Sequence, residues 1–234
     1  MNQKIILIIP AYNEENSIEK TVQTVINSGY DYIVINDGSS DSTGRILADN
    51  HYNHINLISN LGIGGAVQTG YKYALYNNYD IAIQFDADGQ HDIKYINALI
   101  EPIKKEQANL VIGSCFINKN NKNLRSSKFR RAGIRFLSNF IKLFSSKRIY
   151  DPTSGFRAAD KSVISRFAKE YPLEYPEPVS NFELLKDPRI TIQEVPVTMN
   201  KRTGGKSSIR SWKSIYAAFN VMISILTSST KDKK

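Results

Sequence analysis

The first 80 residues repeat a strand followed by a helix, and this repetition constrains the fold more than any other feature. Apolar runs at residues 4–10, 32–36 and 55–58 have the length and composition of buried strands. Polar segments that start at residues 11, 37 and 60 each lead into a predicted helix. Repeated units of this kind predict a parallel sheet, whose ligands bind beyond the carboxyl ends of the strands.

A fourth apolar run, at residues 81–85, ends in a pair of aspartates. Asp86 and Asp88 are separated by one residue and followed by Gly89, so a turn could direct both carboxylates to one hard cation. Mg²⁺ or Mn²⁺ held by one or two carboxylates keeps coordination sites for phosphate oxygens. We therefore predict a metal–diphosphate site on an exposed rim, with an ordinary acidic turn as the alternative. His91 is expected to be an exposed turn residue.

The glycines at 62, 64 and 65 do not form a dinucleotide-binding pattern. Their spacing differs from G-x-G-x-x-G, and they follow the third predicted strand instead of the first. The chain has no G-x-x-x-x-G-K-[ST] sequence, which excludes the common phosphate-loop ATPases. We expect residues 60–70 to contain a loop beside a nucleotide, with Asp37, Gly64 and Asp86 on the same edge of the sheet.

Six segments together resemble a known family. They are IIPAYNEE (8–15), VINDGSSDST (34–43), NLGIGGAVQTGYKYA (60–74), DADGQH (86–91), DPTSGFRA (151–158) and EVPVTMNKRTGGKSSI (194–209). In this order they resemble the family 2 inverting glycosyltransferases with the GT-A fold, in particular the dolichyl- or polyprenyl-phosphate sugar synthases. The resemblance implies a single α/β domain with a mostly parallel, Rossmann-like sheet flanked by helices. A C-terminal basic loop and an amphipathic helix would follow.

The resemblance also implies roles for residues at the predicted sheet edge. It implies a metal site at Asp86 and Asp88, with the carbonyl oxygen of Gln90 as a further hard ligand. A loop carboxylate such as Asp37 can accept hydrogen bonds from a base N–H or a ribose hydroxyl. The nucleotide-binding residues that the resemblance implies are Pro10, Ala11, Tyr12, Glu14, Asp37, Gly64, Gly65, Asp86 and Ala87.

A segment in the middle of the chain resembles the acceptor side of these enzymes. Residues 151–157 match a stretch in which Arg157 could engage an anionic group, and turn formation is the alternative role for Asp151. Glu177 lies in the sequence Tyr-Pro-Glu-Pro-Val of residues 175–179. Relatives often carry a second acid where this chain has Val179. Asp151 and Glu177 are therefore the candidate catalytic bases.

A glycine-rich basic loop follows at residues 201–208. Its backbone N–H groups, with Arg202 and Lys206, could close over a diphosphate. A solvent-exposed hairpin is the alternative.

Charge is distributed unevenly along the chain. Residues 1–100 carry 5 Lys/Arg and 11 Asp/Glu, whereas residues 101–234 carry 26 and 11, and the net charge is +9. A helix predicted over residues 126–144 would place Lys128, Arg131, Arg135 and Lys142 opposite four phenylalanines. Such a helix could lie on anionic lipid with Arg131 and Arg135 near an acceptor phosphate, or pack on the core with a solvated basic side. No recognised nucleic-acid-binding motif accompanies the charge, so nucleic acid is not an expected partner.

Composition indicates one main domain. A chain of 234 residues with 41% hydrophobic residues can form one large core, and we assign residues 1–210 to it. Residues 211–234 are expected to form an amphipathic helix and a basic tail, too short in apolar residues to span a bilayer. This helix could lie in the membrane interface, pack on the core, or contact a second copy or a membrane protein. The lone Cys115, with no signal peptide visible, indicates a cytoplasmic location, here at the inner face of the membrane.

The combined hypothesis is a metal-dependent inverting glycosyltransferase. It would move a sugar from a nucleotide-diphosphate donor to a polyprenyl phosphate, an acceptor that is ionised near neutral pH because its second pKa is about 6. Transfer to the hydroxyl of a glycan or lipid-linked sugar, in cell-surface polysaccharide synthesis, is the alternative and would need Asp151 or Glu177 as a base. A non-catalytic subunit that binds sugar nucleotide or lipid phosphate is the alternative from another class.

Overall fold

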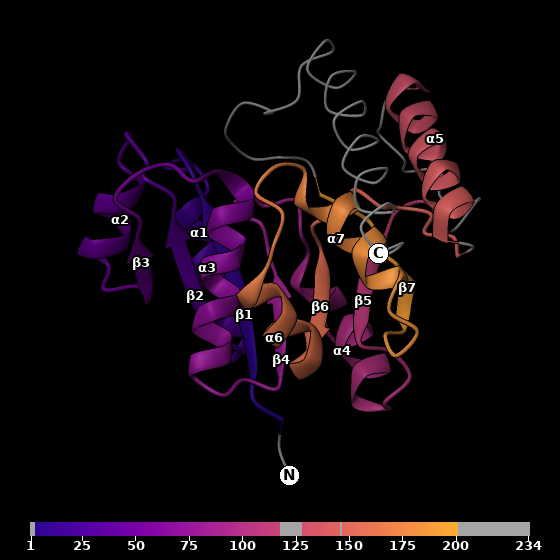
Figure 1. Ribbon diagram of the computed structural model, residues 1–234. Coiled ribbons are helices and arrows are strands. Elements are labelled where there is room, and N and C mark those ends of the chain that lie inside the picture. The colour runs from indigo at the N-terminus through magenta and orange to yellow at the C-terminus, as the bar shows by residue number, and fades with distance from the viewer. Residues whose placement is uncertain (1–2, 118–127, 146, 201–234) are drawn as a thin grey trace.

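The computed structural model describes residues 3–117, 128–145 and 147–200. These residues form one seven-stranded mixed sheet with helices on both faces (Figure 1), which confirms the predicted α/β fold. In spatial order the strands are β3 (His54–Asn56), β2 (Asp31–Asn36), β1 (Ile5–Ala11), β4 (Ile81–Gln84), β6 (Arg157–Asp160), β5 (Leu110–Ser114) and β7 (Ile192–Pro196).

β1 lies at the centre of the parallel part of the sheet. It pairs in parallel with β2 on one side and with β4 on the other. Ile6 and Ile8 belong to the core on one face, Leu7 and Ile9 to the core on the other, and all four are fully buried. Because both faces are covered, the strand requires a continuous apolar run instead of an alternating one.

One strand runs in the opposite direction. β6 is antiparallel to both of its neighbours, β4 and β5, whereas β5 and β7 are parallel to each other. The carboxyl ends of β1, β2, β4, β5 and β7 and the amino end of β6 consequently lie on the same edge of the sheet, which we call the carboxyl edge. The sequence predicted the parallel pairs but did not indicate the reversed strand.

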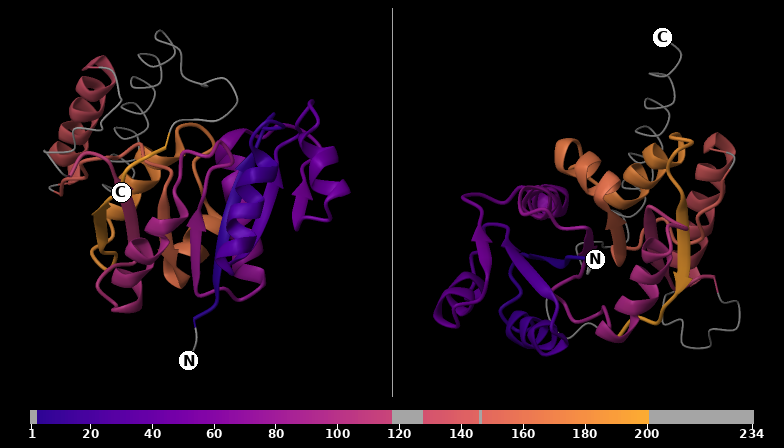
Figure 2. Two further views of the ribbon diagram at one scale, coloured as in Figure 1. Left: turned by 180° about the vertical axis from the view of Figure 1, so that it is seen from behind. Right: turned by 90° about the horizontal axis from the view of Figure 1, so that it is seen from below.

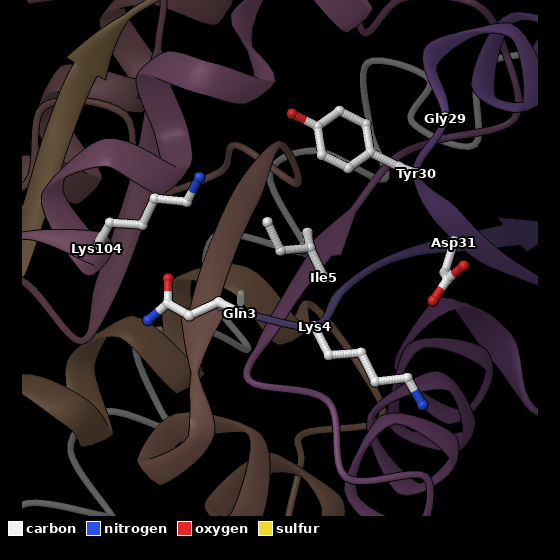
Figure 3. Close-up of a pocket in the computed structure, with 7 residues that line it drawn as sticks. All are labelled: Gln3, Lys4, Ile5, Gly29, Tyr30, Asp31 and Lys104. Carbon is white, nitrogen blue, oxygen red and sulfur yellow. The ribbon is translucent and has the colours of Figure 1, made fainter. Parts of the chain in front are cut away.

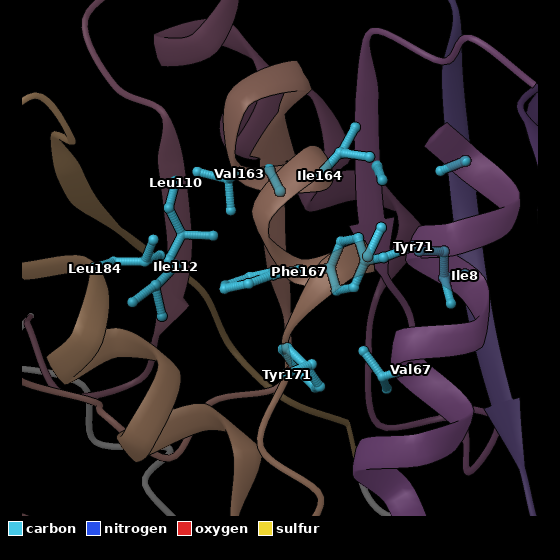
Figure 4. Close-up of a cluster of buried hydrophobic side chains, with 14 of the residues drawn as sticks. Ile8, Val67, Tyr71, Leu110, Ile112, Val163, Ile164, Phe167, Tyr171 and Leu184 are labelled. Carbon is cyan, nitrogen blue, oxygen red and sulfur yellow. The ribbon is translucent and has the colours of Figure 1, made fainter. Parts of the chain in front are cut away.

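Two helical layers cover the sheet, each over its own hydrophobic core (Figure 2). One layer contains α3 (Gly62–Tyr76), α6 (Lys161–Lys169), α7 (Pro176–Leu185) and, at one side, α5 (Lys128–Ser145). The other contains α1 (Ile18–Ser28), α2 (Thr43–Asp49) and α4 (Ile96–Lys104), which follows the 3₁₀ turn η1 (Ile93–Tyr95). In the first core the Tyr71 ring lies 5.1 Å from the Phe167 ring and 5.8 Å from the Tyr171 ring, centroid to centroid (Figure 4).

α1 begins later than the sequence predicted, and α3 begins earlier. Ala11 belongs to β1 and α1 begins only at Ile18, so residues 12–17 form a loop at the carboxyl edge. α3 begins at Gly62, so the prediction that Gly64 and Gly65 lie in a loop is wrong. A Cβ atom at Gly64 would approach the carbonyl oxygen of Pro172 to 2.3 Å, so this glycine lets the start of α3 pack directly on neighbouring backbone.

α5 presents three distinct sides. Its buried side attaches the helix to the core through Ile134, Leu137, Ser138 and Ile141. A second side carries Arg135 and Lys142 in solvent. On the third side Phe136 is 56% and Leu143 is 76% exposed. The predicted helix is confirmed, but aliphatic residues, not the phenylalanines opposite the charges, make most of its core contact. No helix among the described residues, α5 included, is long and apolar enough to cross a membrane.

Several predictions concern parts of the chain outside the described residues. These are the basic loop with Arg202 and Lys206, the domain boundary at residue 210, and the helix and tail at 211–234. The side chain of Lys128 is also outside them.

The contact between α3 and β1 predicts a steric effect at Gly70. A Cβ atom there would lie 2.1 Å from Cγ2 of the fully buried Ile8. Overpacking of this kind costs roughly 1–3 kcal/mol, so Gly70→Ala should lower the free energy of unfolding by about that amount in urea denaturation.

Gly133→Ala is the matched control in α5, because nothing lies within 4 Å of the Cβ atom it would add. Better helix propensity should stabilise that variant by up to about 1 kcal/mol. Equal unfolding midpoints for the two variants would contradict the close packing of α3 on β1.

Candidate active site

Acidic side chains from separate segments gather at the carboxyl edge. Asp37 follows β2 and Asp86 follows β4, so these two residues flank the end of β1. Asp151 lies in the loop that leads into β6. Glu177 lies in the first turn of α7, within hydrogen-bonding distance of the amide of Gln84, which also reaches Asp86. The parallel strands therefore bring Asp37 and Asp86 to one edge, as predicted.

The turn after β4 holds the two predicted metal ligands. The backbone reverses at Gly89, whose φ angle is 77°. The side chain of Asp86 is 34% exposed, whereas Asp88 is only 7% exposed, so the prediction of an exposed rim is wrong for Asp88. Asp88 Oδ1 accepts the N–H of Gln90 at 2.9 Å, and the hydroxyl of Thr21 donates to the carbonyl of Ala87 at 2.9 Å. These bonds fix the turn on both sides of Asp88.

His91 is buried, and its predicted exposure is wrong. Its ring stacks on Phe156 at a centroid distance of 4.4 Å and an interplanar angle of 14°. Its Nδ1 accepts the backbone N–H of Asp86 at 2.9 Å, and its Nε2 lies 3.5 Å from Asp86 Oδ2. Burial lowers the pKa of His91 to about 4, so the ring is neutral near neutral pH. The burial of His91 could not be predicted from the sequence, because Phe156, which stacks on the ring, comes from the loop before the reversed strand β6.

Gln84 is a site residue that sequence reasoning missed. It ends β4 and is almost completely buried. Its Nε2 lies 3.3 Å from Asp86 Oδ1 and 3.4 Å from Glu177 Oε1, so one amide group links two acids. Burial raises the pKa of Glu177, and the charge of Asp86 acts in the same direction. The available signal was a single amide side chain inside an apolar strand.

Arg157 points into the core, which does not support its predicted contact with an acceptor. Its side chain is fully buried, and its guanidinium donates to Ser180 Oγ at 3.0 Å and to the hydroxyl of Tyr171. The Phe167 ring lies 5.4 Å from the guanidinium carbon. These contacts tie β6 to α7, and the strand alternation that directs Arg157 inward was not apparent without the sheet order.

The predicted nucleotide-binding residues occupy two kinds of position. Tyr12 is 49% exposed, whereas Glu14 and Asp37 are buried. Asp37 Oδ1 accepts the N–H of Leu61 at 2.7 Å at the start of α3, and burial raises the pKa of Asp37. Glu14 Oε2 accepts the hydroxyl hydrogen of Ser17 at 2.7 Å. The other candidates are buried in strand, helix or turn: Pro10, Ala11, Gly64, Gly65 and Ala87.

Asp151 connects the strand ends beside the site. Its Oδ2 accepts the N–H of Cys115 at 3.2 Å, just after β5, and its own N–H donates to Glu194 Oε1 of β7 at 2.8 Å. Its Oδ1 accepts the hydroxyl hydrogen of Thr153 at 3.3 Å. Asp151 is thus a buried loop-forming residue, and its role as a base stays a prediction.

The donor atoms on the turn of residues 86–90 fit a hard divalent cation. Within residues 3–117, 128–145 and 147–200, no three His, Cys, Asp or Glu side chains converge on one point. A cation shared with a diphosphate does not require such a group, because Mg²⁺ is usually held by one or two carboxylates while phosphate and water complete its shell. Asp86, Asp88 and Gln90 supply only oxygen donors, which suits Mg²⁺ or Mn²⁺.

A separate hollow of about 650 Å³ lies away from these residues (Figure 3). It is lined by Gln3, Lys4, Ile5, Gly29, Tyr30, Asp31 and Lys104. Since these residues surround the amino ends of β1 and β2, the hollow lies at the edge of the sheet opposite to the acidic site.

Comparison with known proteins assigns the chain to a family. A family model described as "Glycosyl transferase family 2" matches residues 6–169, which extend from β1 through α6 and include the turn after β4. The chain belongs to glycosyl transferase family 2. This membership makes the chain a glycosyltransferase.

Two named relatives of this family 2 glycosyltransferase match most of its length. A UDP-N-acetylglucosamine–dolichyl-phosphate N-acetylglucosaminyltransferase from Methanococcus voltae is 35% identical over 213 residues, covering 82% of this chain and 84% of the relative. A polyprenol monophosphomannose synthase from Mycolicibacterium smegmatis is 28% identical over 173 residues, covering 70% of this chain and 64% of the relative.

Solved structures share the fold of this glycosyltransferase. Glucosyl-3-phosphoglycerate synthase from Mycobacterium tuberculosis in complex with UDP matches with a TM-score of 0.66 at 18% identity, covering 97% of this chain and 80% of that chain. The same enzyme with Mn²⁺, UDP-glucose and phosphoglyceric acid matches with a TM-score of 0.65 at 18% identity, with the same coverage. At this identity the likeness establishes the GT-A type of fold alone.

The buried His91 predicts a pH dependence of stability in the metal-free protein. Folding lowers its pKa from 6.5 to about 4, so the unfolded chain binds a proton more readily than the folded chain. This contribution to stability is complete above pH 6.5 and is lost as the pH falls toward 4, by up to about 3 kcal/mol. His91→Phe keeps an aromatic ring that cannot be protonated.

Chemical denaturation at several pH values measures the effect. Between pH 6.5 and 4 the free energy of unfolding should fall less steeply for His91→Phe than for the wild type. Parallel profiles for the two proteins would show that His91 is not buried as a neutral ring.

Proposed function

We propose that this glycosyltransferase transfers a sugar, with inversion, from a nucleotide-diphosphate donor to a polyprenyl phosphate. The observation that carries the proposal is the turn of residues 86–90, which two hydrogen bonds fix in place. Its oxygen donors lie at the carboxyl edge of the sheet, beyond the ends of parallel strands. The relatives named for dolichyl and polyprenol phosphates support the acceptor. The complexes of the structural neighbour with UDP and Mn²⁺ support the donor and the metal.

In this proposal the turn after β4 binds the diphosphate end of the donor. Asp86, Asp88 and Gln90 would hold Mg²⁺ or Mn²⁺, which when bound supplies positive charge to the leaving diphosphate. The polypeptide contributes a rigid support, because the N–H of Gln90 and the hydroxyl of Thr21 fix the turn before any ligand binds.

The nucleoside would lie at the ends of β1 and β2. Tyr12 offers an exposed ring beside the loop of residues 12–17. Asp37 uses Oδ1 to hold the N–H of Leu61, and a carboxylate has further lone pairs for a base N–H or a ribose hydroxyl. We therefore assign Asp37 both a structural role at the start of α3 and a binding role.

The acceptor phosphate would meet basic side chains. Arg131 is half-buried and Arg135 is exposed on α5, and Arg202 and Lys206 belong to the basic loop predicted from sequence. A phosphate attacks as an anion and needs little base catalysis near neutral pH. Arg157 is fully buried and cannot contact an acceptor. We therefore assign the phosphate contacts to α5 and the basic loop.

One observation favours a second candidate, transfer to a sugar hydroxyl. The Gln84 amide links Glu177 to Asp86, and burial raises the pKa of Glu177, which makes its carboxylate a stronger base. A hydroxyl acceptor would require such a base. Asp151 is the other candidate base, and its carboxylate accepts hydrogen bonds from Cys115 and Thr153.

Acceptor identity is tested directly by a transfer assay. The purified chain is incubated with a panel of nucleotide sugars, short-chain polyprenyl phosphate and Mn²⁺ or Mg²⁺, and products are identified by mass spectrometry. The proposal expects one glycosyl residue added to the lipid phosphate, and no product in chelator. Transfer only to sugar hydroxyls would select the second candidate, and absence of transfer from every donor would contradict both.

The proposed metal ligands predict the effect of removing one charge. Asp86→Asn and Asp88→Asn should each lower turnover by about 10²-fold or more, because charge compensation at the leaving diphosphate is lost. Asp92→Asn is the matched control: Asp92 has the same chemistry but pairs with Lys94 at 2.6 Å, outside the proposed site. Wild-type turnover in either test variant would exclude the metal assignment.

We also propose that α5 brings the enzyme to the cytoplasmic face of an anionic membrane. Its basic side includes Arg131, Arg135 and Lys142, and its exposed apolar side includes Phe136 and Leu143. Both sides of a single helix could contact a membrane, because charges bind anionic headgroups while aromatic and aliphatic groups enter the interface.

Charge reversal on α5 tests this proposal. Each basic residue near an anionic surface contributes about 1 kcal/mol at low salt, so changing Arg131, Arg135 and Lys142 together to Glu should weaken liposome binding by about 100-fold. Sedimentation with anionic liposomes measures it. The control changes the exposed Lys20, Lys72 and Lys104 to Glu, with the same net charge change on other helices. Equal losses of liposome binding in both variants would show that net charge causes the effect, and would contradict a specific role for α5.

A further inference from the structure

We propose that Gln84 and His91 are positioning residues that hold the Asp86 carboxylate from two sides. The inference rests on the proposed role of Asp86 as a metal ligand. Gln84 reaches Oδ1 at 3.3 Å from the end of β4. His91 reaches Oδ2 at 3.5 Å from the far side of the turn. Neither residue was among the predicted site residues.

The imidazole of His91 has a defined tautomer. Since Nδ1 accepts the backbone N–H of Asp86 at 2.9 Å, a neutral ring carries its proton on Nε2. That proton lies on the nitrogen nearest to Asp86 Oδ2. His91 therefore hydrogen-bonds the backbone of Asp86 and places its Nε2 edge close to Oδ2, so a neutral ring limits where the carboxylate can lie without adding charge.

The ring of His91 cannot easily rotate away. It stacks on Phe156 at 4.4 Å and meets Phe85 edge-on at 5.7 Å, measured between ring centroids. Phe85 belongs to the strand end and Phe156 to the loop before β6. Aromatic packing from two segments thus fixes the direction in which the imidazole contacts Asp86.

Gln84 separates Asp86 from a second acid. Its Nε2 carries two hydrogens, and the carboxylate oxygens of Asp86 and Glu177 lie 3.3 Å and 3.4 Å from it. Among the described residues nothing pairs with its buried Oε1. An unpaired buried oxygen costs stability, which an apolar residue at this position would avoid. The observation favours a role for the amide N–H groups at the two acids.

Gly155 keeps the space around this arrangement clear. A Cβ atom at Gly155 would lie 2.7 Å from Gln84 Nε2 and 3.4 Å from Asp86 Oδ2. Because Gln84 is almost completely buried, its amide has little room to move aside. The Asp86 carboxylate is therefore positioned before a metal arrives.

Mn²⁺ binding measures positioning independently of turnover. Electron paramagnetic resonance would follow free Mn²⁺ as it is titrated into the full chain, with and without UDP. Gln84→Met keeps the length of the side chain but removes both N–H groups, and His91→Phe keeps the stacked ring but removes both nitrogens. Partners in the outer shell of a metal site typically contribute 10–100-fold to affinity, so each variant should bind Mn²⁺ at least tenfold more weakly.

Three further variants separate positioning from folding. His91→Asn retains an acceptor for the Asp86 N–H but not the contact to Oδ2, so its Mn²⁺ affinity should lie between those of the wild type and His91→Phe. Gly155→Ala should weaken Mn²⁺ binding although both positioning residues are retained, because its Cβ atom would displace the Gln84 amide. His54→Phe, on β3 away from the site, should bind as the wild type does. Thermal unfolding of each variant identifies any that do not fold.

The outcomes distinguish this inference from the proposed function. If the wild type binds Mn²⁺ and Asp86→Asn does not, while Gln84→Met, His91→Phe and Gly155→Ala bind within twofold of the wild type, the positioning role is wrong and the metal site stands. If wild type and Asp86→Asn bind Mn²⁺ equally, the metal assignment itself fails, and the positioning role fails with it.

Discussion

Parallel hydrogen bonding of β1 to β2 and β4 determines where the candidate residues that follow these three strands lie. The pairing brings the carboxyl ends of three strands to one edge, and burial of β1 on both faces keeps this part of the sheet in the interior. A slip by one residue would exchange the two faces of β1 and expose Ile6 and Ile8 to the wrong core.

The site concentrates acids where water is partly excluded, which costs free energy in the absence of a ligand. Burial raises the pKa values of Asp37 and Glu177, and Asp88 is largely buried as well. Backbone N–H groups offset part of this cost at Asp37 and Asp88. The remaining negative charge is what a divalent cation would neutralise, so the same arrangement that weakens the ligand-free fold would favour cation binding.

Features that depend only on neighbouring residues in the sequence were predicted correctly. The apolar runs gave the parallel strands, the charge segregation gave α5, and the Asp86–Asp88 pair gave a turn at the carboxyl edge. Two of the errors depend on the reversed strand β6. That strand turns Arg157 into the core, and the loop before it brings Phe156 onto His91. Gln84 was missed because one of its two acidic partners, Glu177, lies 93 residues further along the chain, on α7.

The central claim is that a divalent cation binds at the turn after β4, and paramagnetic broadening by Mn²⁺ tests it most directly. The ¹⁵N-labelled chain would be titrated with substoichiometric Mn²⁺ in the presence of UDP, and amide signals followed by NMR. The account expects the signals of residues 86–90 to broaden first, and those of residues 3–5 and 29–31, around the hollow at the opposite edge, to stay sharp. Broadening centred on the hollow, or uniform along the chain, would contradict it.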